Sequence, residues 1–270
     1  MRNLIALAAM LVFGAGLAAI VGCGSDTAAD TSTQGPGANL AGETKSETTE
    51  QAGSGMAAIE KAAQAKKYLF ALFRKEEDGQ TAAMRSVLQE LAKEVSDRAD
   101  SIEIDVTSAS EKAIIDKFEL GRAPMPLLLA IAPNGAITGG FPTKVEKQEI
   151  VEAFVSPSTE KCLKRLQENK LVLLCVQNAN TKSNDAAMKG VSEFKADARF
   201  AQATEIVLLD PADAAEAAFL DDLQISPKTE SAVTVFLAPP GTPIAMYQGA
   251  TSKDELAAAL QKASSACGPG

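Results

Sequence analysis

The sequence predicts an α/β protein with two tandem domains, each a central mixed β-sheet flanked by helices. One block of residues repeats after about 105 positions. Around each copy, short apolar runs alternate with amphipathic stretches, which is the pattern of an α/β domain. The chain before residue 56 is an apolar run followed by a polar segment without a core. We therefore expect the first domain at 56–157 and the second at 158–270.

The N-terminal segment has the pattern of an export signal. A basic residue precedes an apolar run of about 18 residues, a length that is borderline for crossing a bilayer. The run is rich in Ala and Gly and ends in Ile20-Val21-Gly22-Cys23. This tetrapeptide resembles the lipobox of bacterial lipoproteins, in which the cysteine is diacylated and becomes the first residue. The resemblance implies a signal peptide at 1–22 and a lipid anchor on Cys23; an uncleaved membrane anchor is the alternative.

The same resemblance implies where the protein resides. Stable anchoring takes two or more acyl chains, such as palmitate, and lipoprotein processing supplies them. Gly24, rather than Asp, follows the cysteine. By resemblance to enteric bacteria, this favours the outer membrane facing the periplasm over the inner membrane. We expect a protein of the bacterial cell envelope that is bound to the membrane through Cys23.

Residues 23–55 have the composition of a lipidated flexible linker. They are mostly Ser, Thr, Gly, Ala and acidic residues, and Leu40 is the one large aliphatic side chain before the end of the segment. Such a segment buries too little apolar surface to order itself. A chain of this length and composition has a root-mean-square reach on the order of 30 Å. We expect it to hold the folded part away from the membrane.

The charge and the composition exclude several kinds of function. The chain has 26 basic and 35 acidic residues and a net charge of −9, so nucleic acid is a poor partner. It contains no His, which removes the commonest general base and metal ligand. Ser-His-Asp catalysis, Cys-His catalysis and His-based zinc sites are therefore excluded. We expect no metal and no cofactor.

The internal repeat aligns residues 105–120 with residues 210–225 without gaps. Asp105 meets Asp210, and Glu111 meets Glu216. The apolar positions of the first block also meet apolar positions of the second: Ile114, Ile115, Phe118 and Leu120 correspond to Phe219, Leu220, Leu223 and Ile225.

The same order of elements, β-α-β-α-β-β-α, is predicted around each block. Apolar runs predict strands, spacings of three and four predict helices, and Pro, Asn and Gly mark turns. The first copy contains strand 68–73, helix 81–99, strand 102–106, a short helix, strand 127–131, a turn at 133–135, strand 136–141 and helix 147–154. The second contains strand 171–176, helix 184–200, strand 205–209, helix 215–223, strand 233–237, a turn at 239–241, strand 244–247 and helix 253–262.

This order is similar to the thioredoxin fold, and the first copy adds a local signature. Residues 120–129, with Met125 and Pro126 before a strand, resemble the thioredoxin segment that holds a cis-proline. A cis X-Pro bond is accessible because it costs only about 0.5–1 kcal/mol. The resemblance implies that Pro126 lies beside the functional site and helps to bind extended peptide. In the second copy, Ala232 takes the position of the proline.

The chain departs from the thioredoxin pattern at the redox site. The family places Cys-x-x-Cys between the first central strand and the next helix. Here that position falls at residues 78–81 and, in the second copy, within 177–183, and neither segment contains sulfur. Thiol exchange needs an attacking thiolate and a resolving thiol, so it is excluded at the usual site. Asp78 and Asn184 are instead predicted to cap the helices that follow.

Three cysteines remain after Cys23. Cys175 lies in an apolar strand and is predicted to be a small core residue. Cys162 and Cys267 each follow the closing helix of their own copy, and in an oxidising compartment a disulfide between them is plausible. The alternatives are a redox-active pair or a thiol metal site built on the same two cysteines.

These observations lead to one functional hypothesis and two alternatives. The hypothesis is a membrane-anchored, redox-inactive pair of thioredoxin-like domains, not an enzyme, that binds protein or peptide near Met125, Pro126 and Asp78. One alternative is an envelope thiol oxidoreductase or metal-binding protein that uses Cys162 and Cys267. The other is a structural scaffold without a ligand, in which the groove at Pro126 is filled by the protein's own side chains.

Overall fold

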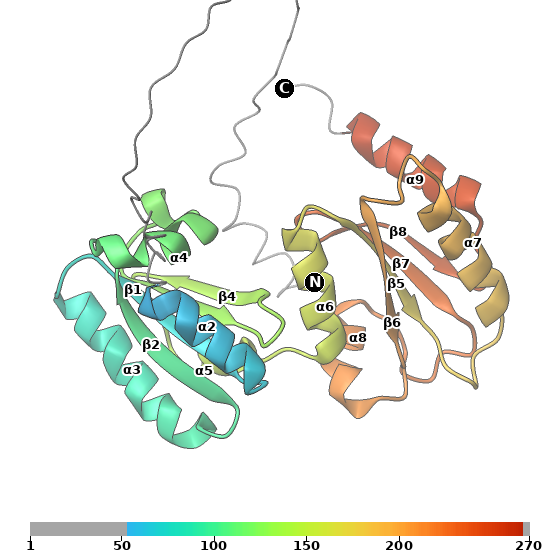
Figure 1. Ribbon diagram of the computed structural model, residues 1–270. Coiled ribbons are helices and arrows are strands. Elements are labelled where there is room, and N and C mark those ends of the chain that lie inside the picture. The colour runs from blue at the N-terminus through green and yellow to red at the C-terminus, as the bar shows by residue number, and fades with distance from the viewer. Residues whose placement is uncertain (1–52, 267–270) are drawn as a thin grey trace, which may run out of the picture.

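The computed structural model describes residues 53–266, which form two α/β units (Figure 1). The signal peptide, Cys23, nearly all of the linker and Cys267 lie outside the described residues. The first unit runs α2 (Ser54–Gln64), β1 (Tyr68–Arg74), α3 (Gly79–Val95), β2 (Ala99–Asp105), α4 (Lys112–Lys117), β3 (Leu127–Ile131), β4 (Ile137–Pro142) and α5 (Lys147–Glu152). The second runs α6 (Pro157–Gln167), β5 (Leu171–Val176), α7 (Asn184–Ala196), β6 (Thr204–Leu209), α8 (Ala217–Asp222), β7 (Val233–Ala238), β8 (Thr242–Gln248) and α9 (Lys253–Ala266).

Each unit has a four-stranded mixed sheet with the same topology. The strand orders are β2-β1-β3-β4 and β6-β5-β7-β8. The first central strand pairs in parallel with the edge strand that follows it, and antiparallel with the next central strand. The last strand returns antiparallel through a tight turn. The predicted fold class, two mixed sheets flanked by helices, is confirmed.

Helices cover both faces of each sheet. β1 is almost entirely buried, because its alternate side chains enter separate apolar cores. α3 and α5 cover one face of the first sheet, while α2 and α4 cover the other. In the second unit, α6 and α8 cover one face, and α7 and α9 cover the other.

The sequence prediction missed the first helix of each unit. α2 begins at Ser54, inside the last two residues of the expected linker, and α6 begins at Pro157, where the two domains are expected to meet. The predicted helix 81–99 is also too long. α3 ends at Val95, and the chain from Ala99 to Asp105 is strand β2. Residues 96–98 form a turn, and Ala99 belongs to β2 because that strand pairs along its whole length with β1.

The structural reason for the repeat is a buried glutamate in each unit. Glu111 accepts hydrogen bonds from the backbone N–H of Gly55 at 3.0 Å and from the hydroxyl of Ser54 at 2.6 Å. Glu216 accepts a hydrogen bond from the backbone N–H of Ser158 at 3.0 Å and another from the hydroxyl of Ser156. Each carboxylate therefore satisfies free donors at the N-terminus of the first helix of its own unit.

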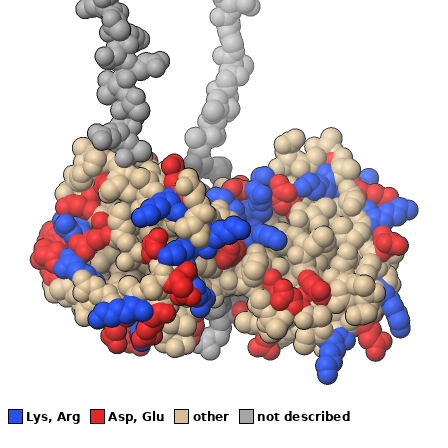
Figure 2. Space-filling view, turned by 60° about the horizontal axis from the view of Figure 1, so that its bottom comes forward, with Lys and Arg blue, Asp and Glu red and all other residues tan. Residues whose placement is uncertain are grey.

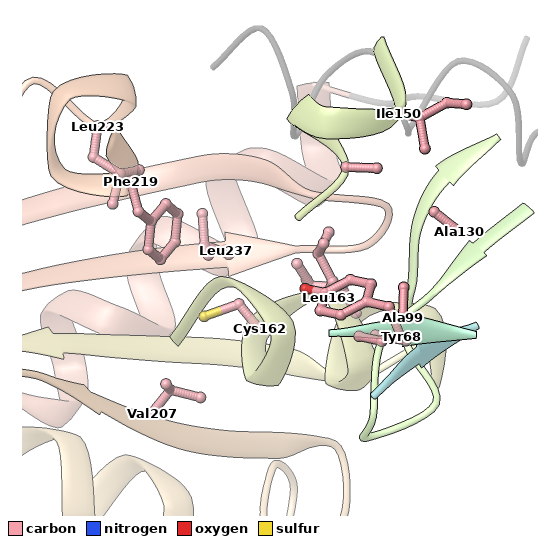
Figure 3. Packing of buried hydrophobic residues seen from close by; sticks show 14 of the residues in the cluster. Tyr68, Ala99, Ala130, Ile150, Cys162, Leu163, Val207, Phe219, Leu223 and Leu237 are labelled. Carbon is pink, nitrogen blue, oxygen red and sulfur yellow. The ribbon is translucent and has the colours of Figure 1, made fainter. Parts of the chain in front are cut away.

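One apolar core joins the two units. The cluster of Tyr68, Phe70 and the α3 side chains continues into α6 and the inner face of the second sheet. Figure 3 shows Cys162 and Leu163 of α6 in this cluster, between Phe219 of the second unit and Tyr68 of the first.

Hydrogen bonds reinforce this joint. The Tyr68 hydroxyl donates to Glu160 at 2.7 Å and accepts from the N–H of Val155 at 3.2 Å. The Gln167 side chain bonds both the N–H and the C=O of Ile137. The two units thus share buried surface as well as a connecting chain.

We predict that Glu111→Gln and Glu216→Gln each lower the free energy of unfolding by about 2 kcal/mol, because an amide replaces a charged acceptor of two hydrogen bonds. Urea unfolding of the chain from residue 24 measures the change. Glu60→Gln, on the exposed side of α2, is the control and should change stability by less than about 0.5 kcal/mol. A buried-site variant as stable as this control would contradict the assignment.

A second prediction concerns pH. Burial raises the pKa of Glu160 above its ordinary value. Its contribution to stability is therefore fully present below the unfolded-state pKa and is lost as the pH rises through the folded-state pKa. As the pH falls from about 7 to about 4, the unfolding free energy of the wild type should therefore rise relative to that of Glu160→Gln. Parallel curves of unfolding free energy against pH for the two proteins would contradict this.

Candidate functional site

A groove of about 320 Å³ lies at the C-terminal end of β1 in the first unit. One wall is the loop between β1 and α3, and the other is the segment that leads into β3. The structure brings all the sequence-predicted binding residues together here: Asp78, Met125 and Pro126 line the groove, together with Lys75, Glu76, Thr81 and Ala123.

The loop wall is held in place by its own hydrogen bonds. Asp78 caps α3 as predicted, since its carboxylate accepts from the N–H of Thr81 at 2.7 Å. That hydrogen bond holds the pKa of Asp78 below its ordinary value. The Thr81 hydroxyl in turn donates to the carbonyl of Glu76 at 3.2 Å. The loop therefore has a defined shape without any cysteine.

An arginine fixes the same loop from outside. Arg85 of α3 donates two hydrogen bonds to Glu77, at 2.6 and 2.7 Å, and two more to Glu103 of β2. These bonds lower the pKa of both carboxylates. Bidentate Arg–carboxylate pairs have a fixed geometry, so the loop is tied to both α3 and β2.

The second wall contains the predicted cis-proline. The Met125–Pro126 peptide bond is cis, which confirms that prediction. Pro126 is buried and Met125 is half-buried. The carbonyl of Pro126 accepts from the N–H of Thr143 at 2.7 Å. Among the described residues, neither the N–H nor the C=O of Met125 has a hydrogen-bond partner.

The second unit closes the equivalent position with its own chain. Lys182, in the loop before α7, donates its N–H to the carbonyl of Glu230 at 2.8 Å and accepts from the N–H of Ala232 at 2.9 Å. Ala232 stands where the first unit has Pro126. Because proline has no N–H, the first unit cannot form the second of these bonds. The sequence alone gave no sign of this closure.

The loop of the second unit corrects one prediction. Asn184 does not cap α7 from the position before the helix; it is the first residue of the helix. Its side chain accepts from the Thr181 hydroxyl at 2.6 Å and donates to the carbonyl of Asn178 at 2.7 Å. Ser183 precedes the helix in the left-handed conformation, with φ of 65°. Asn184 therefore braces the loop that pairs with residues 230–232.

The described thiols lie in the core. Cys175 is buried in β5, as predicted, and Cys162 is a free, fully buried cysteine of α6. Burial raises the pKa of each thiol to about 12. The proposed partner, Cys267, lies outside the described residues, so the Cys162–Cys267 disulfide stays a prediction.

Residues 53–266 contain neither a cluster of metal ligands nor a helix that could cross a bilayer. No three His, Cys, Asp or Glu side chains gather there in a way that could hold a metal ion. Nor does that part of the chain contain a helix with the length and apolar character needed to cross a bilayer.

Comparison with known proteins adds the following. No family model matches the chain, and no curated protein matches it. Similar solved structures include the first two thioredoxin domains of Saccharomyces cerevisiae Eps1p, at 9% identity, 73% coverage of this chain, 92% of that one and a TM-score of 0.28. Human ERp44 matches at 8% identity, with 85% and 61% coverage and a TM-score of 0.32. The thioredoxin Deadhead from Drosophila melanogaster matches at 20% identity, with 34% and 80% coverage and a TM-score of 0.28.

Proposed function

We propose that this protein binds an extended segment of a protein or peptide at the groove beside Pro126, without thiol chemistry. The observation that supports this most is the free backbone of Met125. Its N–H and C=O have no partner among the described residues, and Met125 lines an open groove. A peptide that adds to such an edge satisfies both groups through main-chain hydrogen bonds.

The side chains of the groove add apolar contact and a rigid frame. Met125 is flexible and adapts to different apolar partners. The opposite wall is fixed by Asp78 at the start of α3 and by the Arg85–Glu77 pair. A preformed wall lowers the entropy cost of binding, so the groove suits an unstructured segment whose side chains vary.

The second unit acts as a support in this proposal. Its own residue, Lys182, pairs with the C=O of Glu230 and the N–H of Ala232, on either side of the position that Met125 holds in the first unit. The apolar core that the two units share and the Tyr68–Glu160 hydrogen bond fix the second unit against the first.

The alternative functions have less support. A thiol oxidoreductase or a thiol metal site at Cys162 needs an accessible thiolate, whereas this thiol is 0% exposed. A pure scaffold needs the groove at Pro126 to be filled, whereas a volume of about 320 Å³ is open there. We therefore retain binding as the function, and we propose that lipid on Cys23 holds the binding unit at the envelope membrane.

The binding proposal predicts the effect of Met125→Ser. Loss of the apolar side chain removes about 1.5–3 kcal/mol of burial, so affinity for an unfolded polypeptide should fall about tenfold or more. Fluorescence anisotropy with labelled, reduced and carboxymethylated α-lactalbumin measures it on the chain from residue 24. Ser231→Ala, at the equivalent position of the closed second unit, is the matched control and should bind like the wild type. Equal losses in both variants, or no binding by the wild type, would refute the proposal.

The thiols give a separate test. In a Cys267→Ser variant, the native protein should show almost no thiol reactivity at about pH 8, because Cys162 and Cys175 are buried and their pKa values are raised to about 12. Both should react after denaturation. A thiol that reacts rapidly in the native variant would contradict this prediction and would favour the oxidoreductase alternative over binding. With Cys267 present, one thiol after denaturation without reductant and three with it would establish the predicted disulfide.

A further inference from the structure

We infer that the cavity between the two units is a second binding site, which takes the C-terminal carboxylate of a peptide that ends in an apolar residue. The cavity has a volume of about 430 Å³ and is lined from both units. This volume lies in the range of about 300–1,000 Å³ that is typical of ligand sites, and such sites often lie between domains.

Arg98 supplies the charge that recognises the carboxylate. It stands in the turn between α3 and β2, and its guanidinium carbon lies 4.2 Å from the centroid of the Phe154 ring. Stacking of this kind uses the flat face of the guanidinium and leaves its N–H edges free. Within residues 53–266, the Arg98 side chain has no hydrogen bond and no ion pair, so these donors are available to a carboxylate.

A second arginine shows what is unusual about Arg98. Arg199 of the second unit also stacks on a phenylalanine, with its guanidinium carbon 4.9 Å from the Phe200 ring. Its Nε and Nη2 donate to Asp197 at 2.9 and 2.8 Å. These donors of Arg199 are therefore already occupied, whereas Arg98 lines a cavity and has no such partner within residues 53–266.

The floor of the cavity suits an apolar side chain. Phe154 is held from behind by Tyr68 and Phe70, whose ring centroids lie 4.7 and 5.5 Å away. Leu163 and Phe219 line the same cavity from the second unit and are themselves buried. An apolar side chain that enters would contact a rigid surface formed by both units.

The remaining charges favour a peptide end over a simple anion. Glu152 also lines the cavity, and its carboxylate would repel a multiply charged group such as phosphate. A peptide C-terminus carries one carboxylate beside backbone N–H donors, which suits the pair of Arg98 and Glu152. In Figure 2, basic and acidic side chains are interspersed on the face that is shown.

The cavity and the groove at Pro126 are separate sites. Tyr68 begins β1 and packs on the Phe154 side, whereas the groove follows Arg74, where β1 ends. This inference therefore does not depend on the proposed function of the groove.

The test compares two short peptides on the chain from residue 24. Both have the sequence Gly-Ser-Gly-Ser-Phe with an N-terminal fluorophore; one ends in a free carboxylate and the other in an amide. We expect the acid to bind about tenfold more tightly than the amide, as a charge-assisted hydrogen bond implies. Arg98→Gln should abolish this preference, whereas Arg199→Gln, the matched control, should retain it. Thermal melts establish that both variants are folded.

Three results would overturn the inference. They are equal binding of the acid and the amide to the wild type, no binding of either peptide at millimolar concentration, and an unchanged preference in Arg98→Gln. The first two need no variant, so they stand even if Arg98→Gln fails to fold. A preference that is lost in Met125→Ser but kept in Arg98→Gln would assign the peptide to the groove instead. Failure here leaves the test of the groove with unfolded α-lactalbumin unaffected.

Discussion

The hydrogen bonds between a buried glutamate and the first helix of each unit are the interaction on which the rest of the fold depends. Glu111 and Glu216 are 6% and 3% exposed, and an unpaired carboxylate at such depth would be costly. Each is satisfied by donors at the N-terminus of the helix that opens its unit. The pair of bonds joins the first helix to the connection after the second strand, far along the chain, so that helix closes one face of the sheet.

The first helix has a different role in each unit. α2 packs on the outer face of the first sheet, whereas α6 packs between the second sheet and the first unit. α6 supplies Cys162 to the joined core and Glu160 to the bond with Tyr68. The same interaction thus holds a helix on an outer surface in one unit and at the interface in the other, and the cavity beside Arg98 lies along that interface.

The two units also differ in one backbone donor. Ala232 donates its N–H to Lys182 and closes the second unit's loop, whereas Pro126 has no N–H to donate. The groove beside Met125 is open in the first unit. Its loop wall keeps its shape because Asp78 and Arg85 hold it by hydrogen bonds. A repeat of one fold has therefore produced two different surfaces, one open to a partner and one filled by its own chain.

The sequence by itself determined the order of the strands and of the helices that follow them, the cap at Asp78 and the absence of cysteine from the usual redox position, while the resemblance of residues 120–129 to a known segment implied the cis bond before Pro126. These features depend on local periodicity and on residue chemistry, which a single segment displays. The tertiary structure alone decided that α2 and α6 are helices packed by distant glutamates, that Cys162 is buried, that the second unit's site is closed and that Arg98 faces a cavity. Each of these depends on contacts between segments far apart in the chain, and no local pattern records which distant groups will meet.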